Sequence, residues 1–285
     1  MSRKKKSVLS LLLIVLIAMT GCLIVPRILH RAEIARSAKL YADEIIRIPD
    51  KERPNTGFTC TGLFWDEKEG NFLLGNAGRY EHEDKTPFQA GVEIVDFRFS
   101  RIKNSIPCYQ TFPGMRDIQG VCKIADGSIW VCSYGENKVR HMSPDGRDIG
   151  SFDLKEANGI AADARTNQLW VLTRDHLYRC DYSGKIDKSF KVKIRGQDQL
   201  YLDEKEDLMY LTAGADYQGD SYVYTVDLKT GQVKVKYVLK DSFAVEGMSI
   251  VNGIMYVLND GHYHGAKDAK NQVNCYDLKN IGTEK

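Results

Sequence analysis

The chain has 285 residues, and its 40 Lys and Arg against 38 Asp and Glu give a formal charge of only +2. So small an imbalance produces no field that would attract nucleic acid or another polyanion, and we exclude nucleic acid as a partner. After the N-terminal segment, about 240 residues remain, which is enough for one large all-β domain.

The first 26 residues predict a signal anchor or a lipoprotein signal. The basic stretch Arg3–Lys6 precedes an apolar run from Val8 to Val25, an order typical of an export signal. At ~1.5 Å per residue such a helix is about 27 Å long, just enough to cross a bilayer core. The excess of basic residues before the run places the N-terminus inside and the domain outside the cytoplasm.

Two interpretations of this segment remain open. Met19-Thr20-Gly21-Cys22 is similar to a bacterial lipobox, in which Cys22 would be lipidated. The apolar run continues past Cys22, however, and no Ser/Gly-rich tether follows it. We therefore favour an uncleaved anchor helix and keep the lipoprotein as the alternative; either places the domain outside the cytoplasm, attached to the cell membrane.

Residues 27–44 carry apolar side chains at helical spacing and predict a helical stalk. The next segment, Glu44–Ile48, has the composition of a strand and is followed by Pro49. We therefore expect the folded domain to occupy residues 45–285.

A pattern of a polar residue, glycine and an apolar residue recurs along the domain, each time about ten residues before an aromatic or apolar strand. The five copies begin at Thr61, Gln119, Asn158, Asp198 and Glu246, and the fourth has Gln199 in place of the glycine. The copies recur about every 40 to 50 residues, and a repeat of this length with several short strands per unit is typical of a β-propeller. We expect blades starting near residues 57, 115, 155, 195 and 243.

The fifth repeat runs out of chain after its third strand, Gln272–Asp277. The strand at Glu44–Ile48 is the obvious fourth strand, and its pairing would close the ring and protect a sheet edge. The sequence thus predicts five blades of four strands. Six blades would need one hidden between Thr61 and Gln119, where only a long loop and two outer strands are expected.

Five polar residues open the inner strands and are expected to converge at the mouth of the channel. They are Thr61, Gln119, Asn158, Asp198 and Glu246, to which the long loop of the last repeat adds Asn259, Asp260, His262 and His264. Long loops on a rigid ring commonly carry binding residues. Carboxylate and amide oxygens at this mouth could bind Ca²⁺ or a polar ligand. The alternative is a channel filled with water, which would require the same polar lining.

The copies at Asn158-Gly159-Ile160 and Glu246-Gly247-Met248 resemble repeats of the NHL, regucalcin/gluconolactonase and SdiA-regulated propeller families. In gluconolactonase-like enzymes the matching glutamate, asparagine and a further aspartate hold a divalent cation. The resemblance therefore implies a metal set of Glu246, Asn158 and Asp198. That family has six blades and carries its glutamate in the first, whereas Glu246 lies in the last repeat here.

Two functions follow as hypotheses. The first is a membrane-anchored extracytoplasmic propeller that binds a small molecule or an envelope protein through its loop-rich face and channel mouth. The alternative is a lactonase-like hydrolase that depends on a metal such as Ca²⁺. The seven cysteines do not suggest a disulfide framework, and we interpret those of the domain as small buried strand residues.

Overall fold

The computed structural model describes residues 26–48, 60–78, 89–194, 196–214, 220–260 and 271–281. The chain divides into two compact units, Met1–Ser37 and Ala38–Lys285, and each is considered by itself. In the first unit residues 26–36 are helical, so the expected stalk at 27–44 is too long. Its second half was misassigned because residues 38–40 and 44–47 pair as strands in the second unit.

None of the helices in the described ranges has the length and apolar character that crossing a membrane requires. The predicted anchor, Val8–Val25, and with it Cys22, lies outside the described residues. The anchor therefore stays a prediction.

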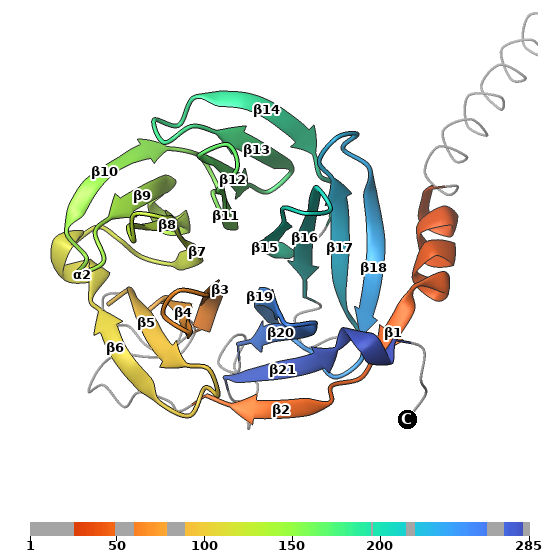
Figure 1. Ribbon diagram of the computed structural model, residues 1–285. Helices are drawn as coiled ribbons and strands as arrows, with labels where there is room; N and C mark the ends of the chain where they lie inside the picture. Colours follow the sequence, from red (N-terminus) through yellow and green to blue (C-terminus); the bar gives the residue numbers. More distant parts are fainter. Residues whose placement is uncertain are drawn as a thin grey trace, which may run out of the picture. The chain divides into compact units, whose positions relative to one another are not determined.

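The second unit is a five-bladed β-propeller with four antiparallel strands in each blade, as the repeats predict (Figure 1). Blade 1 comprises β3 (Cys60–Asp66), β4 (Asn71–Asn76), β5 (Gly91–Asp96) and β6 (Ile102–Ile106). Blade 2 comprises β7 (Ile118–Lys123), β8 (Ile129–Ser133), β9 (Lys138–Met142) and β10 (Asp148–Asp153). Blade 3 comprises β11 (Ile160–Asp163), β12 (Gln168–Leu172), β13 (His176–Cys180) and β14 (Ile186–Lys191).

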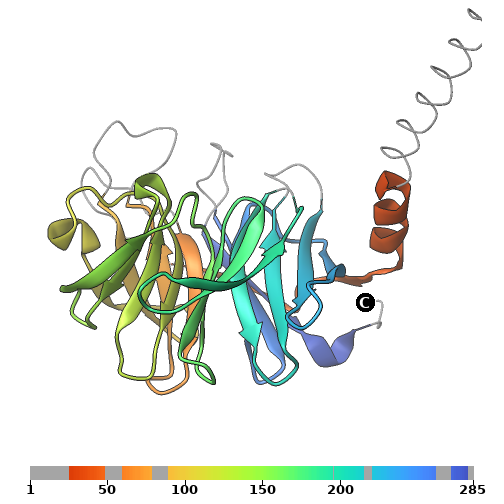
Figure 2. The same ribbon diagram turned by 90° about the horizontal axis from the view of Figure 1, so that it is seen from above.

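Blade 4 comprises β15 (Gln197–Asp203), β16 (Leu208–Ala213), β17 (Ser221–Asp227) and β18 (Val233–Leu239). Blade 5 comprises β19 (Val245–Val251), β20 (Ile254–Asn259), β21 (Gln272–Asp277) and β2 (Glu44–Arg47). Three short helical turns, α2 (Cys108–Thr111), η1 (Tyr134–Glu136) and η3 (Leu278–Asn280), lie between or after these strands. The inner strands β3, β7, β11, β15 and β19 surround the axis, and the strands run between two faces (Figure 2).

The N-terminal strand closes the ring, which confirms the predicted closure. β2 pairs antiparallel with β21, from Glu44 opposite Cys275 to Arg47 opposite Gln272. Ile48, only 4% exposed, continues this strand into the core between blades 1 and 5. An additional strand that the sequence did not predict, β1 (Ala38–Leu40), lies parallel to β18 and extends blade 4 to five strands.

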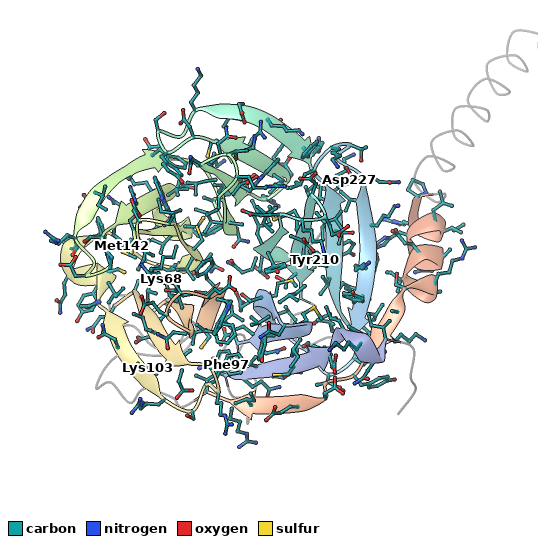
Figure 3. All side chains as sticks on the ribbon, viewed as in Figure 1. Lys68, Phe97, Lys103, Met142, Tyr210 and Asp227 are labelled. Carbon is teal, nitrogen blue, oxygen red and sulfur yellow. The ribbon has the colours of Figure 1, made fainter. Side chains whose placement is uncertain are left out.

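Large apolar side chains fill the spaces between blades (Figure 3). Trp130, Trp170 and Tyr210 occupy equivalent positions in the second strands of their blades and are 1%, 2% and 7% exposed. The six cysteines of the described ranges are buried, and five of them lie in strands as expected, whereas Cys108 lies in the helical turn α2.

The glycines of the repeated motif let neighbouring inner strands approach each other closely. A Cβ added to Gly247 would lie 2.5 Å from the backbone nitrogen of Leu63, and one added to Gly62 would lie 2.6 Å from the carbonyl oxygen of Gln119. Gly120 and Gly159 make the same approach to the next blade, at 2.7 Å from Asn158 O and Asp198 O. These distances leave no room for a side chain, so the glycines set the radius of the ring.

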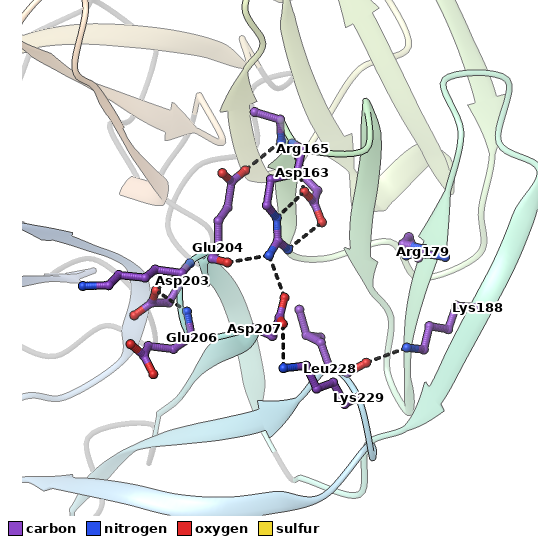
Figure 4. Close-up of polar contacts among 12 residues, drawn as sticks. Asp163, Arg165, Arg179, Lys188, Asp203, Glu204, Glu206, Asp207, Leu228 and Lys229 are labelled. Atoms are coloured by element: carbon purple, nitrogen blue, oxygen red, sulfur yellow. Dashed lines mark hydrogen bonds and ion pairs between the residues drawn. The ribbon is translucent and has the colours of Figure 1, made fainter.

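On the face of the short turns, Arg165 of blade 3 reaches the turn of blade 4 (Figure 4). Its guanidinium is 3.0 Å from the buried carboxylate of Asp163 and 2.6 Å from Asp207, and it also bonds the carbonyl of Glu204. Burial raises the pKa of Asp163, but the hydrogen bonds and charge of Arg165 lower it by more, so the pKa lies below its usual value. One cation thus joins two blades.

We expect Gly247→Ala to destabilise the propeller by about 1–3 kcal/mol, because the new Cβ must displace the backbone of β3. The free energy of unfolding in urea measures this loss. Gly150→Ala is the control, since a Cβ at Gly150 in β10 would meet nothing within 4 Å. Equal stability of the two variants would contradict the steric role of the motif.

We expect Arg165→Gln to cost about 1–2 kcal/mol at pH 7, because the buried Asp163 carboxylate loses its charged partner. The lowered pKa of Asp163 stabilises the fold above its unfolded pKa of about 4, and this contribution is lost as pH falls through the folded value. The difference from wild type in urea unfolding should therefore shrink between pH 5 and about pH 2. Arg147→Gln, which removes an exposed pair with Asp145, should leave stability unchanged throughout.

Candidate functional site

A cavity of about 310 Å³ lies at the ends of the inner strands where the repeated motifs begin. It is lined by Asp117, Gln119, Tyr134, Asn158, Gly196, Asp198, Gly214, Ala244, Val245 and Glu246. Four of the five inner-strand residues expected at the channel mouth thus meet in one cavity, from blades 2 to 5. Their role as ligands stays a prediction.

Four of the five motifs, those of blades 1, 2, 4 and 5, form a bulge at the start of the inner strand. In blade 2 Ile118 pairs with Ser133 and Val121 with Val131, so Gln119 and Gly120 together oppose Cys132. The same shift occurs in blades 1, 4 and 5 at Thr61, Asp198 and Glu246. A bulge re-aims side chains and is common beside binding sites. The bulge explains why a polar residue and a glycine recur as a unit.

The backbone turns sharply two residues before Gln119, Asn158, Asp198 and Glu246. Asp117, Glu156, Gly196 and Ala244 all have positive φ, at 57°, 56°, 66° and 34°. Left-handed backbone is costly for residues other than glycine, and it persists only where the surroundings impose it. Asp117, Gly196 and Ala244 line the cavity as a result of this turn.

The cavity carries negative charge. Asp117, Asp198 and Glu246 supply three carboxylates, and no Lys, Arg or His is among its lining residues in the described part of the chain. Glu246 is only 7% exposed. Because buried like charges repel and lack solvent, such a group favours a cation or several hydrogen-bond donors in the cavity.

Neighbouring amides hold two of the carboxylates. Asn158 Nδ2 donates to Asp198 Oδ1 at 3.3 Å, and Gln119 Nε2 donates to Asp117 Oδ1 at 2.5 Å. Burial raises the pKa of the Tyr134 phenol most, and the charges of Glu156, Asp117 and Asp198 raise it further, whereas the positive charge of Arg174 lowers it. Tyr134 therefore remains a neutral donor at the rim.

Sequence reasoning missed Asp117 and Tyr134. Asp117 has a detectable signal, since it lies two residues before Gln119, where the other repeats carry Glu156, Gly196 and Ala244. Tyr134 follows β8 in η1, and its backbone nitrogen donates to Asp117 O at 3.0 Å. No motif links these two residues, because the contact depends on the tight return from β8 to β9.

Several expected site residues do not line the cavity. Thr61 is 2% exposed and lies behind the wall, as do the fully buried Asn259 and Asp260. Asn259 Oδ1 accepts from Phe243 N at 2.8 Å, and Asp260 N donates to Ala244 O at 3.1 Å. These contacts fix the segment that carries Ala244 and Val245 into the wall. His262 and His264 lie outside the described residues.

The proposed metal set, Glu246, Asp198 and Asn158, lies in the wall of one cavity. Within the ranges that the structure describes, no three His, Cys, Asp or Glu side chains form a group that could hold a metal ion. Glu246, Asp198 and Asn158 offer two carboxylates and one amide oxygen. A tight Ca²⁺ site has more charged ligands than these.

No protein-family model and no curated protein matches this chain. Among solved structures, a luciferin-regenerating enzyme is similar with a TM-score of 0.51 and 11% identity over 82% of this chain and 94% of its own. The WD40 repeats of RRP9 also give 0.51, with 8% identity over 85% and 99%. Streptogramin B lyase gives 0.46, with 13% identity over 85% and 88%.

At these identities the similarity to the first two structures shows the fold alone, that of a β-propeller. The class of protein that fold and cavity define is thus a five-bladed β-propeller with an acidic channel mouth. The finer resemblance to gluconolactonase-like enzymes is carried by the motif residues only.

Proposed function

We propose that this chain is a membrane-tethered extracytoplasmic propeller that binds a small polar ligand at its channel mouth. One observation supports this most: four aligned side chains from blades 2 to 5 line a single cavity, and its lining in the described ranges holds three carboxylates and no basic residue. Its volume of about 310 Å³ suits a small molecule or a hydrated cation.

The chemistry of the wall favours a ligand with positive charge or many hydrogen-bond donors. When they are ionised, the carboxylates of Asp117, Asp198 and Glu246 can only accept hydrogen bonds. The hydroxyl of Tyr134 can orient the ligand from the rim. A carboxylate as buried as Glu246 gains more from a cation than an exposed one, because little solvent screens the pair.

A lactonase-like hydrolase is the second candidate. Its support is the meeting of Glu246, Asn158 and Asp198 in one wall, where the motif resemblance implies a divalent cation. Such an enzyme would use the cation to polarise a carbonyl and to activate water. The measurement that separates the two candidates is therefore whether a metal ion or only an organic cation binds at Glu246.

We expect a cation that binds at the channel mouth to stabilise the fold, by about 2.7 kcal/mol at a hundredfold excess over Kd. Thermal unfolding with chelator and with millimolar Ca²⁺, Mg²⁺, Mn²⁺ or Zn²⁺ tests the metal, and spermidine tests an organic cation. Glu246→Gln should abolish the gain while the protein stays folded.

The matched control is Glu69→Gln, which removes an exposed carboxylate from the turn at the far end of β3 and should keep the full gain. Stabilisation by spermidine but by no metal would favour the binding module over the hydrolase. If none of these cations changes the melting curve, the result contradicts a cationic ligand at the channel mouth and also the lactonase.

We propose further that residues 8–25 remain in the mature protein as its membrane anchor. The support is the apolar run that continues beyond Cys22 without a tether. Cys22→Ala should then leave the protein in the membrane fraction, and neither form should incorporate labelled palmitate. Label that is present in the wild type and lost in Cys22→Ala would show a lipoprotein instead.

A further inference from the structure

A second cavity lies at the opposite ends of the same inner strands, among the short turns that join first to second strands. It has a volume of about 580 Å³ and is walled by the ends of β3, β7, β11 and β15 and the turns that follow them. A smaller cavity of about 210 Å³ adjoins it and shares the walls Phe64, Trp65, Ala162, Tyr201 and Leu202. The face with the short turns thus holds the larger of the two cavities, although its connections are shorter than those of the opposite face.

The floor of this cavity is aromatic. Phe64, Trp65, Tyr182 and Tyr201 line it, and all four are half-buried. Trp65 is fixed by Phe72 and Phe97, with ring centroids 4.8 and 5.4 Å away. Tyr201 is fixed because its hydroxyl donates to the carbonyl of Ile250 at 3.3 Å. The floor is therefore a rigid surface of ring faces and edges, already ordered before any ligand arrives.

The charges around the rim largely compensate each other. Among the residues that the structure describes, four acidic and three basic residues line this cavity, whereas three acidic and no basic residues line the channel mouth. Asp66, which is 6% exposed, forms an ion pair with Lys123. Glu204 Oε1 accepts from Ala164 N at 2.7 Å, and Asp203 Oδ1 accepts from the backbone nitrogens of Lys205 and Glu206. A charged ligand would have to compete with these contacts.

We propose that this cavity is a second binding site, for an uncharged small molecule with a flat aromatic or polycyclic body. The aromatic floor supplies stacking and apolar area, and the size of the cavity is that of sites for molecules of several rings. Because the charged side chains around the cavity are largely paired with each other or with backbone groups, the site favours a ligand without a formal charge. The same lysines and carboxylates can form hydrogen bonds with a polar edge of that ligand. The site is independent of the channel mouth, since the two cavities share no lining residue.

The test uses N-phenyl-1-naphthylamine, an uncharged aromatic dye, with the full chain in detergent micelles that contain no tryptophan. Excitation of the three tryptophans, Trp65, Trp130 and Trp170, reports bound dye by energy transfer, and empty micelles serve as the blank. The phenylalanine variants that follow assign the bound dye to the cavity. We expect saturable transfer with one dye per chain. Ala162→Phe and Ala164→Phe, which place a ring in the cavity, should each weaken dye binding at least about tenfold.

Thr166→Phe is the matched control, because Thr166 is exposed on the same turn and does not line the cavity. It should bind the dye like the wild type. Should the half-buried Ala162 not tolerate phenylalanine, Ala164→Phe decides alone, since Ala164 is exposed. Transfer that does not saturate, or equal binding by folded Ala164→Phe and wild type, would overturn the proposal.

Discussion

The close approach of neighbouring inner strands is the constraint on which the rest of this structure depends. Gly62, Gly120, Gly159 and Gly247 each face the backbone of the next blade at a distance that excludes a Cβ. A wider ring would separate the polar residues that precede these glycines, and no cavity of about 310 Å³ could be walled by four blades at once. The same bulge that carries the glycine also turns its polar neighbour toward the axis. Packing and site are therefore consequences of one local feature.

The two ends of the inner strands differ in chemistry because the residue pattern changes along each strand. Asp198 and Glu246 lie at the beginning of β15 and β19, whereas Tyr201, Leu202 and Ile250 lie toward the end. In a propeller both ends open to a face, so one set of short strands can present an acidic cavity on one face and an aromatic cavity on the other. A propeller can therefore carry two unlike sites without a second domain.

The repeat pattern was sufficient to predict the blade count, the closing strand and the meeting of Gln119, Asn158, Asp198 and Glu246, because all of these follow from aligned positions. β1 was not predictable, since Ala38–Leu40 has helical spacing with the residues before it and pairs with β18 about 200 residues away. Asp117 was missed because its place depends on a left-handed turn, which the side chain itself disfavours. The cavity of the short-turn face was missed for a different reason. Its walls combine strand ends with short turns, and no repeated motif marks these positions.

The junction between blades 4 and 5 shows how the ring tolerates a departure from its own rule. Gln199 replaces the motif glycine there, and Gly214 at the end of β16 makes the close approach instead, at 2.9 Å from Val245 N. The segment at 38–47 crosses this same junction, because β1 pairs with blade 4 and β2 with blade 5. Between β1 and β2, Ala42 N donates a hydrogen bond to Asp241 Oδ2 at 2.7 Å. The hydroxyl of Tyr201 in blade 4 donates a further hydrogen bond to the carbonyl of Ile250 in blade 5. The N-terminal strands thus do more than complete a sheet. They also join blade 4, whose inner strand has Gln199 in place of the motif glycine, to blade 5.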